Sequence, residues 1–441
     1  MIKKVVKYIF IFLVILIFNL LCSPINLDEI WNYGFSNNLF RGLIPYVDFN
    51  MVIPPFYPWL MSLPFYLLGS NMLIFHMTNA LILTGCLFLL EKMYQDKMWI
   101  FFLFFFFPVN TTFPSYNLFL FVLLVVLYYV EKNFVSRYSW SHYLVGFLLG
   151  ITILTKHTVG FCLFLPSLYY FREWKVLLKR VIGCLVPVLI FIISLIFSDG
   201  FFSFVNLCVL GLFDFSSNSE IFNIYMIFFL IMVLFTVYFI KKNPRDILNY
   251  YVLCFYSIVI PIVDLFHLIY AFLAFLLLIC SHIKKKYVNY SVLSIVCVIV
   301  LAFITAWSNY FDIQYYPNDV HHFEMRFINY EKLQFTKKMN RFLNKNKDKK
   351  IIFLSSDSYY FKIINDEDVG YLDLINQGNL GYQGSEVLLS KIKKMNKDTL
   401  FLVNPNETAH NQTDPMVLEY VLEHGKKIQN IDFYEVYVLE E

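Results

Sequence analysis

Three carboxylates, Asp28, Glu29 and Asp48, lie in one short stretch between the first two hydrophobic segments of the chain. Carboxylates beside a membrane are costly unless they meet a cation, a hydrogen-bond donor or a substrate. Because adjacent residues of a helix point about 100° apart, we expect Asp28 and Glu29 to have different roles. One can face a cavity while the other caps or braces the helix. The structural alternative is that Asp28 is only a helix N-cap and Glu29 a first-turn acid that faces the helix dipole.

Acidic residues and histidines also occur together later in the chain. Asp264 and His267 have i, i+3 spacing, so they would share one face of a helix. The aspartate could orient the imidazole or join it in binding a phosphate group or a metal ion; alternatively, the pair only stabilises a turn. His321 and His322 are followed by Glu324. One of these histidines could reach a cavity, but a solvated linker helix is the simpler interpretation.

The composition places these residues in a polytopic membrane protein. Hydrophobic residues make up 59% of the 441-residue chain, charged residues only 15%, and the mean hydropathy is +0.61. A soluble protein cannot bury that much apolar surface. The net charge of +3 is too small to indicate nucleic-acid binding. The eight cysteines have neither metal-site spacing nor a disulfide framework, and we interpret them as small apolar residues.

The membrane spans can be predicted from apolar runs, which need roughly 17 to 25 residues to cross a bilayer. We predict eleven spans, several of them short, at about residues 5–23, 70–90, 98–113, 115–131, 141–155, 158–171, 181–198, 222–240, 249–263, 267–282 and 288–306. The loops on one side carry nearly all the Lys and Arg residues, whereas the opposite loops hold only Arg41 and Lys156. The positive-inside rule therefore predicts a cytoplasmic N-terminus and an extracytoplasmic acidic loop. An odd number of spans also places the chain after Trp307 outside.

The first extracytoplasmic loop, residues 24–69, is too long for a simple turn. Residues 28–40 have apolar and aromatic side chains at helical spacing, which predicts an amphipathic helix in the membrane interface. Gly42 and Pro45 end this helix. A second interfacial helix is predicted from Pro54-Pro55 to about residue 68.

The composition changes at about residue 311, where charge rises and alternating patterns appear. We predict strands at 351–354, 400–403 and 433–439 and helices at 385–395 and 414–424. The chain therefore divides into a helical transmembrane domain, residues 1–310, and a small extracytoplasmic α/β domain, residues 311–441. The glycines near residue 380 lack the strand-then-GxGxxG context of a nucleotide site, so we expect no such cofactor.

The acidic loop resembles the first extracytoplasmic loop of the GT-C glycosyltransferases. These are polytopic enzymes that use polyprenyl-phosphate-linked sugars, such as protein O-mannosyltransferases, lipid A aminoarabinose transferases and Rgt-type bacterial transferases. An acidic residue after the first span, a G-x-x-P-Y-x-D-F segment and a proline-rich interfacial helix recur in such proteins. The matching residues here are Asp28-Glu29, Arg41-Gly42, Pro45-Tyr46-Val47-Asp48-Phe49 and Pro54-Pro55.

The resemblance implies sugar transfer from a lipid phosphate to an acceptor hydroxyl. By its position in the motif, Asp28 would be the general base that removes the hydroxyl proton. The leaving phosphate needs positive charge or hydrogen-bond donors, for which Arg41, Lys156 and His157 are candidates. Each has an alternative: Lys156 can extend to the lipid headgroups, Arg41 can pair with Asp48 or a lipid phosphate, and His157 can be a polar turn residue.

Other polar residues complete the predicted substrate site. Glu29, Asp48, Asp264 and His267 are candidates for contacts with the substrate or its phosphate. Some metal-dependent GT-C enzymes have an acid in the second extracytoplasmic loop, but residues 108–117 here contain no carboxylate. Asn117 can occupy that place and bind a sugar hydroxyl, but it weakens the case for a tightly held divalent ion. We therefore expect no cofactor, and either catalysis without a metal ion or a metal ion that is held without this loop.

The predicted function is a membrane glycosyltransferase on the outer face of the cytoplasmic membrane. Its partners would be a polyprenyl-phosphate-linked sugar, an envelope glycan, lipid or protein acceptor, and the lipid bilayer. A flippase or other transporter is the main alternative, but it should show two repeated halves with broken spans and polar residues at mid-membrane. A non-catalytic envelope-assembly protein is a third possibility, which would leave the acidic loop unexplained.

Overall fold

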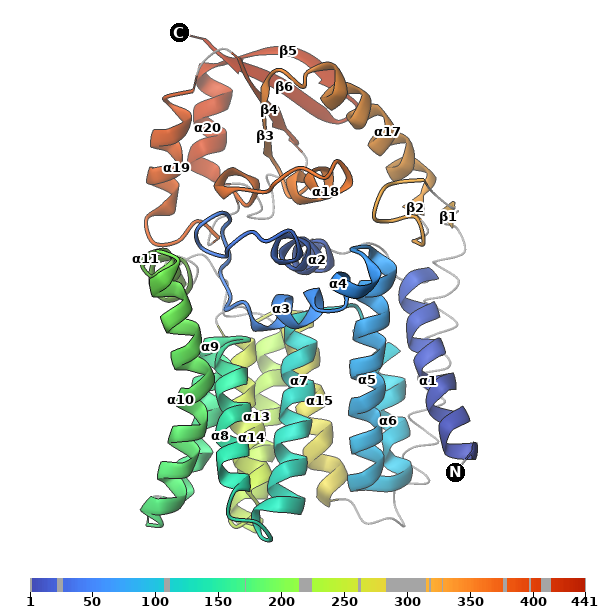
Figure 1. The fold of residues 1–441 in the computed structure, drawn as a ribbon, viewed down its shortest axis with the longest axis vertical. Coiled ribbons are helices and arrows are strands. Elements are labelled where there is room, and N and C mark those ends of the chain that lie inside the picture. The colour runs from blue at the N-terminus through green and yellow to red at the C-terminus, as the bar shows by residue number, and fades with distance from the viewer. Residues whose placement is uncertain are drawn as a thin grey trace.

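Upright helices form a bundle, a layer of short helices covers one end of it, and an α/β domain lies beyond that layer (Figure 1). The computed structural model describes residues 2–21, 27–106, 112–170, 172–213, 224–260, 263–282, 315–316, 319–326, 328–375, 379–395, 398–405 and 414–440. Ten of the eleven predicted spans lie wholly or mostly within these ranges, and the eleventh, 288–306, lies outside the described residues.

The bundle consists of apolar helices. They are α1 (Ile2–Leu21), α5 (Met72–Tyr94), α6 (Met98–Phe106), α7 (Tyr116–Val130), α8 (Ser141–Ile153), α9 (His157–Phe164), α10 (Trp174–Phe197), α13 (Ile224–Lys242), α14 (Ile247–Phe255) and α15 (Leu265–His282). In the described part of the chain, five are long and apolar enough to cross a membrane: α5, α7 with its π-helical extension, α10, α13 and α15. The prediction of a polytopic helical membrane protein is confirmed. Each of the first ten predicted spans overlaps one of these helices.

The layer over the bundle contains α2 (Leu27–Phe40), α3 (Phe56–Ser62) and α4 (Phe65–Leu68). The predicted second helix is interrupted at Leu63-Pro64, because proline cannot continue an interior helical hydrogen-bond ladder. The interfacial position predicted for α2 stays a prediction, but the helix lacks the solvent-facing polar side expected of an amphipathic helix. Most of its residues are buried, because the C-terminal domain covers the face turned away from the bundle.

The C-terminal domain contains a four-stranded sheet in the order β3-β4-β6-β5. Strands β3 (Lys350–Leu354) and β4 (Thr399–Val403) are parallel, with Ile352 opposite Phe401. Strands β6 (Tyr434–Leu439) and β5 (Gly425–Ile431) extend the sheet by antiparallel pairing. The parallel pair requires a crossover, which contains α18 (Ser358–Ile364) and α19 (Gly384–Ile392). Helices α17 (Tyr330–Lys345) and α20 (Pro415–His424) complete the domain, and β1 (Tyr315–Tyr316) pairs with β2 (Ile328–Asn329) before it.

The C-terminal domain contacts α2 directly through α18. A Cβ atom added at Gly34 of α2 would lie 2.6 Å from Cδ1 of the buried Tyr359 in α18. Arg41, which follows α2, pairs with Asp368 at 2.7 Å. The domain and the short-helix layer therefore form one packed unit.

Adding one methyl group at the α2–α18 contact should destabilise the protein. We expect Gly34→Ala to lower the free energy of unfolding by about 1–3 kcal/mol, because the new Cβ overpacks the contact with Tyr359. The matched control is Gly85→Ala in α5, where a Cβ would meet nothing within 4 Å. Thermal unfolding of the purified protein measures both. Equal melting temperatures for the two variants would contradict the packing that we describe.

Candidate functional site

Polar side chains from four elements gather where α2 meets the covered end of the bundle. Asp28 lies in the first turn of α2 and is half-buried. Its carboxylate interacts electrostatically with His267, Asp264 and Lys156. Burial raises the pKa of Asp28, and the charge of Asp264 raises it further, whereas His267 and Lys156 act in the opposite direction. Three residues predicted from separate parts of the sequence are thus brought to Asp28.

Lys156 lies in the turn between α8 and α9 and supplies a positive charge. Burial lowers the pKa of Lys156 to about 8, although the negative charges of Asp264 and Asp28 oppose this shift. Its Nζ atom lies 5.7 Å from the centre of the Tyr116 ring, within reach of a cation–π contact. This ammonium group is partly desolvated and lies beside two acids. It would therefore attract a phosphate more strongly than a fully hydrated surface lysine would.

Asp264 and His267 form the predicted pair at the start of α15. Oδ1 of Asp264 accepts hydrogen bonds from the backbone N–H and from Nδ1 of His267, both at 2.8 Å. Burial alone would raise the pKa of Asp264, but these bonds, the charge of His267 and that of Lys156 bring it below its usual value. Asp264 therefore caps the helix and also orients the imidazole ring, while the binding of a phosphate or metal by this pair stays a prediction.

Amide and imidazole groups near the cluster lack hydrogen-bond partners within the described ranges. They are Oδ1 of Asn32, Oδ1 of Asn117 and both ring nitrogens of His157. Asn32 lies one turn after Asp28, and its Nδ2 atom donates to the backbone carbonyl of Asp28 at 2.6 Å. Buried polar atoms of this kind normally find a partner in protein, water or ligand. These groups can bind the hydroxyls of a sugar.

The sequence analysis missed two residues of the cluster, Tyr270 and Asn32. Tyr270 interacts electrostatically with Asp28 and Asp264, and its hydroxyl lies 3.3 Å from Oγ of Ser115. The signal for Tyr270 was its i, i+3 spacing from His267, and that for Asn32 was its i, i+4 spacing from Asp28.

Glu29 belongs to a structural network and not to the open cluster. Its side chain is fully buried, with Oε1 2.7 Å from Nε2 of His76 and Oε2 3.0 Å from a guanidinium nitrogen of Arg326. Both oxygens are thus held by groups on α5 and on the segment that precedes α17. The division of roles predicted for the two adjacent acids agrees with this geometry. The assignment of Glu29 to the substrate is corrected, because its oxygens already have partners.

Arg41 and Asp48 also have structural partners. Besides its ion pair with Asp368, Arg41 donates to the backbone carbonyl of Glu367 at 3.1 Å. Oδ2 of Asp48 accepts from the backbone N–H of Ile44 at 2.6 Å and stabilises the turn that contains Tyr46 at φ 67°. The alternative that Arg41 pairs with Asp48 is not what the structure shows, since Arg41 pairs with the C-terminal domain. We therefore remove both residues from the proposed substrate site.

The chain shares its fold with solved structures of GT-C glycosyltransferases, and at the identities below this likeness is one of fold. ArnT from Cupriavidus metallidurans bound to undecaprenyl phosphate aligns with a TM-score of 0.60 and 12% identity, over 99% of this chain and 98% of that chain. Its apo state aligns with a TM-score of 0.60 and 11% identity, over 99% and 97%. The predicted GT-C fold is confirmed.

A more distant likeness is to the Archaeoglobus fulgidus oligosaccharyltransferase complex with Zn and sulfate, with a TM-score of 0.46, 11% identity and coverage of 98% of this chain and 73% of that chain. No family model and no curated protein matches the sequence.

The adjacent acids Asp28 and Glu29 should differ sharply in their effect on stability. We expect Glu29→Gln to lower the free energy of unfolding by about 3–5 kcal/mol, because it removes the buried carboxylate charge that pairs with Arg326 and contacts His76. Asp28→Asn should change it by less than about 1 kcal/mol, since burial already disfavours the ionised carboxylate. Denaturation of the two variants, compared with wild type, tests this contrast. A stable Glu29→Gln protein would contradict the bracing role.

Proposed function

We propose that the protein is an integral-membrane glycosyltransferase that moves a sugar from a polyprenyl-phosphate donor to a cell-envelope acceptor. The observation that carries this proposal is the carboxylate of Asp28 beside Lys156 and the Asp264–His267 pair, at the covered end of a GT-C bundle. The ArnT structure of the same fold contains undecaprenyl phosphate, which supports a lipid-phosphate donor.

The proposed reaction is a displacement at the anomeric carbon of the sugar. The acceptor hydroxyl oxygen forms the new glycosidic bond, and the bond from the anomeric carbon to the phosphate oxygen breaks with its electron pair on the lipid phosphate. The hydroxyl proton passes to the carboxylate of Asp28, which acts as general base. Lys156 stabilises the negative charge of the phosphate, and His267 in its imidazolium form donates Nε2–H to the phosphate while Nδ1–H donates to Asp264. Because the phosphate is the leaving group, a single displacement needs no second, nucleophilic carboxylate.

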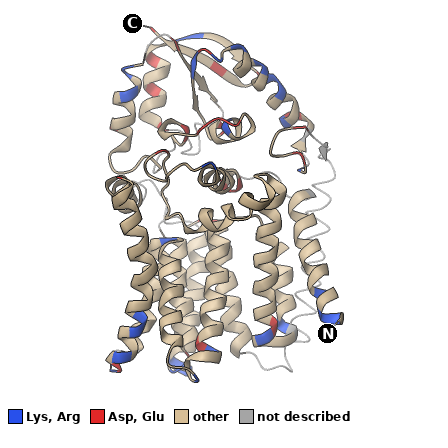
Figure 2. Cartoon of the chain, in the orientation of Figure 1, with Lys and Arg blue, Asp and Glu red and all other residues tan. Residues whose placement is uncertain are grey.

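The distribution of charge supports action on the outer face of the cytoplasmic membrane. Lysines and arginines gather at the end of the bundle away from the C-terminal domain (Figure 2). By the positive-inside rule that end faces the cytoplasm, so α2, the cluster and the C-terminal domain face outward. The acceptor would then be an envelope glycan, lipid or protein that approaches from the C-terminal domain.

Removal of the proposed base should abolish transfer without loss of the fold. We expect Asp28→Asn to lower the rate of sugar transfer on the order of 10²–10⁴-fold, the usual contribution of a general base. The assay uses proteoliposomes with radiolabelled polyprenyl-phosphate sugars and envelope acceptors. The matched control is Asp48→Asn in the same loop, which should keep wild-type transfer because an amide oxygen can still accept from Ile44.

Full transfer by a stably folded Asp28→Asn protein would refute the assignment of the base. If no donor is consumed while labelled lipid-linked sugar crosses the bilayer, the protein is a transporter and the enzyme proposal fails. Neither consumption nor movement of any donor, with intact fold, would favour the assembly role.

The rate should depend on pH in a bell shape set by Asp28 and Lys156. Below the raised pKa of Asp28 the carboxyl is protonated and cannot accept the hydroxyl proton, so the rate falls. Above the Lys156 pKa of about 8 the amine is neutral and loses its attraction for phosphate, so the rate falls again. Lys156→Arg should remove the alkaline decline, because a guanidinium does not titrate in this range. An unchanged alkaline limb in that variant would exclude Lys156 as its source.

A further inference from the structure

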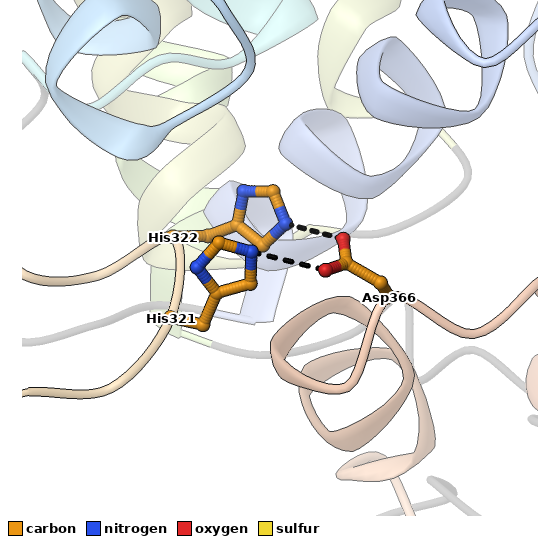
Figure 3. A group of neighbouring side chains, drawn as sticks. All are labelled: His321, His322 and Asp366. Carbon is orange, nitrogen blue, oxygen red and sulfur yellow. Dashed lines mark hydrogen bonds and ion pairs between the residues drawn. The ribbon is translucent and has the colours of Figure 1, made fainter.

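Two adjacent histidines and one aspartate meet at the contact between the short-helix layer and the C-terminal domain (Figure 3). Nε2 of His321 lies 3.0 Å from Oδ2 of Asp366, and Nε2 of His322 lies 3.0 Å from Oδ1. The two imidazole rings are 4.2 Å apart between centres. These three residues, which we call the His–His–Asp cluster, share no residue with the Asp28 cluster. Asp366 is 44 residues from His322 in sequence, so the fold alone brings them together.

The outer nitrogens of both rings face hydrogen-bond acceptors. Nδ1 of His321 lies 3.2 Å from a carboxylate oxygen of Glu324. Nδ1 of His322 lies 2.8 Å from the backbone carbonyl of Ser70 and 2.7 Å from the hydroxyl of Tyr33. A carboxylate and a carbonyl only accept, so each Nδ1 donates to these outer groups, and each Nε2 is the ring nitrogen that faces Asp366. Metal-binding histidines are oriented by this same arrangement of outer acceptors.

The ligand atoms of these three residues lie within 4.8 Å of one another, close enough to share one metal ion. The observed nitrogen–oxygen separations of 3.0 Å are close to the distance of about 3.3 Å between donors arranged tetrahedrally around a zinc ion at about 2.0–2.1 Å. One ion would bind all three residues with only a small outward shift of the ligands.

The backbone at this place also adopts an uncommon conformation. His322 and Asp366 have φ angles of 66° and 53°, in the left-handed region that non-glycine residues seldom occupy. These two residues lie in loops on either side of α17 and β3, and their side chains face each other. Uncommon backbone conformations that persist in two facing loops are typical of ligand-binding positions.

We propose that His321, His322 and Asp366 form a binding site for one divalent transition-metal ion, with Zn²⁺ as the preferred occupant. Two imidazoles and one carboxylate are a donor set that suits zinc. The side chains of His321 and Asp366 are 55% and 58% exposed, whereas that of His322 is 6% exposed. The ion would therefore be anchored by His322 and would keep a fourth position open to water.

The bound ion would clamp the C-terminal domain to the membrane domain. His322 is held to the start of α5, because its carbonyl accepts from the backbone N–H of Met72 at 3.0 Å. Asp366 follows α18, the helix that covers α2. A metal bridge between them would hold α18 over α2 without any contact with the Asp28 cluster. This inference is independent of the proposed function.

Metal binding by the purified full-length protein, without an affinity tag that contains histidine, tests the site. After incubation with Zn²⁺ and removal of free ion by gel filtration, wild type should retain about one zinc per chain by elemental analysis. His321→Gln and Asp366→Asn should each weaken zinc affinity at least on the order of 10–100-fold. Both side chains are more than half exposed, so these variants should fold. His424→Gln, an exposed histidine on α20, is the matched control and should bind as wild type does.

Zinc should also raise the melting temperature of wild type but not of Asp366→Asn, because only the folded site binds the ion. Cobalt absorption provides a readout on wild type alone: intense visible bands indicate the expected four-coordinate site. Equal zinc retention by wild type, His321→Gln and Asp366→Asn would overturn the proposal, as would no retention by wild type or weak octahedral bands with cobalt.

Discussion

The buried ion pairs of Glu29 determine how α2 lies over the bundle. One carboxylate links three elements: α2 itself, His76 on α5 and Arg326 before α17. All three side chains are fully buried, where charges persist only with close partners. This network fixes both the position of α2 and its rotation about its own axis. With Glu29 turned toward Arg326, the adjacent Asp28 must point about 100° away, toward Lys156 and the start of α15.

The chemistry of the candidate site follows from that rotation. Partial burial raises the pKa of the Asp28 carboxyl and lowers that of the Lys156 ammonium. The two pKa values are therefore shifted toward each other. An acid whose charged form is disfavoured accepts a proton readily, which suits a general base. A partly desolvated lysine gains more from a phosphate than a hydrated one would. The same low-dielectric environment therefore favours both proton acceptance by Asp28 and attraction of a phosphate by Lys156.

The spacing of residues along the sequence was enough to predict much of the fold and part of the candidate site. Apolar run length was enough to predict ten of the helices, and i, i+3 spacing was enough to predict the Asp264–His267 pair. The different roles of Asp28 and Glu29 followed from helix geometry, but which acid braces the helix did not. That choice depends on Arg326, 297 residues away. Likewise, Arg41 pairs with Asp368, a contact between domains that leaves no trace in the local pattern. The burial of α2 likewise depends on the C-terminal domain, which covers this helix.

The C-terminal domain thus helps to position the candidate site through its contacts with α2. Arg326, which holds Glu29, lies beyond the last predicted span, and Tyr359 of α18 packs on Gly34 of α2. Any movement of α18 that changes this packing also acts on α2, because the contact leaves no space for an added Cβ. Since Asp28 and Glu29 are on the same rigid first turn, such a movement displaces the carboxylate relative to Lys156 and α15. A ligand that moves α18 would therefore change the position of the Asp28 carboxylate without touching it.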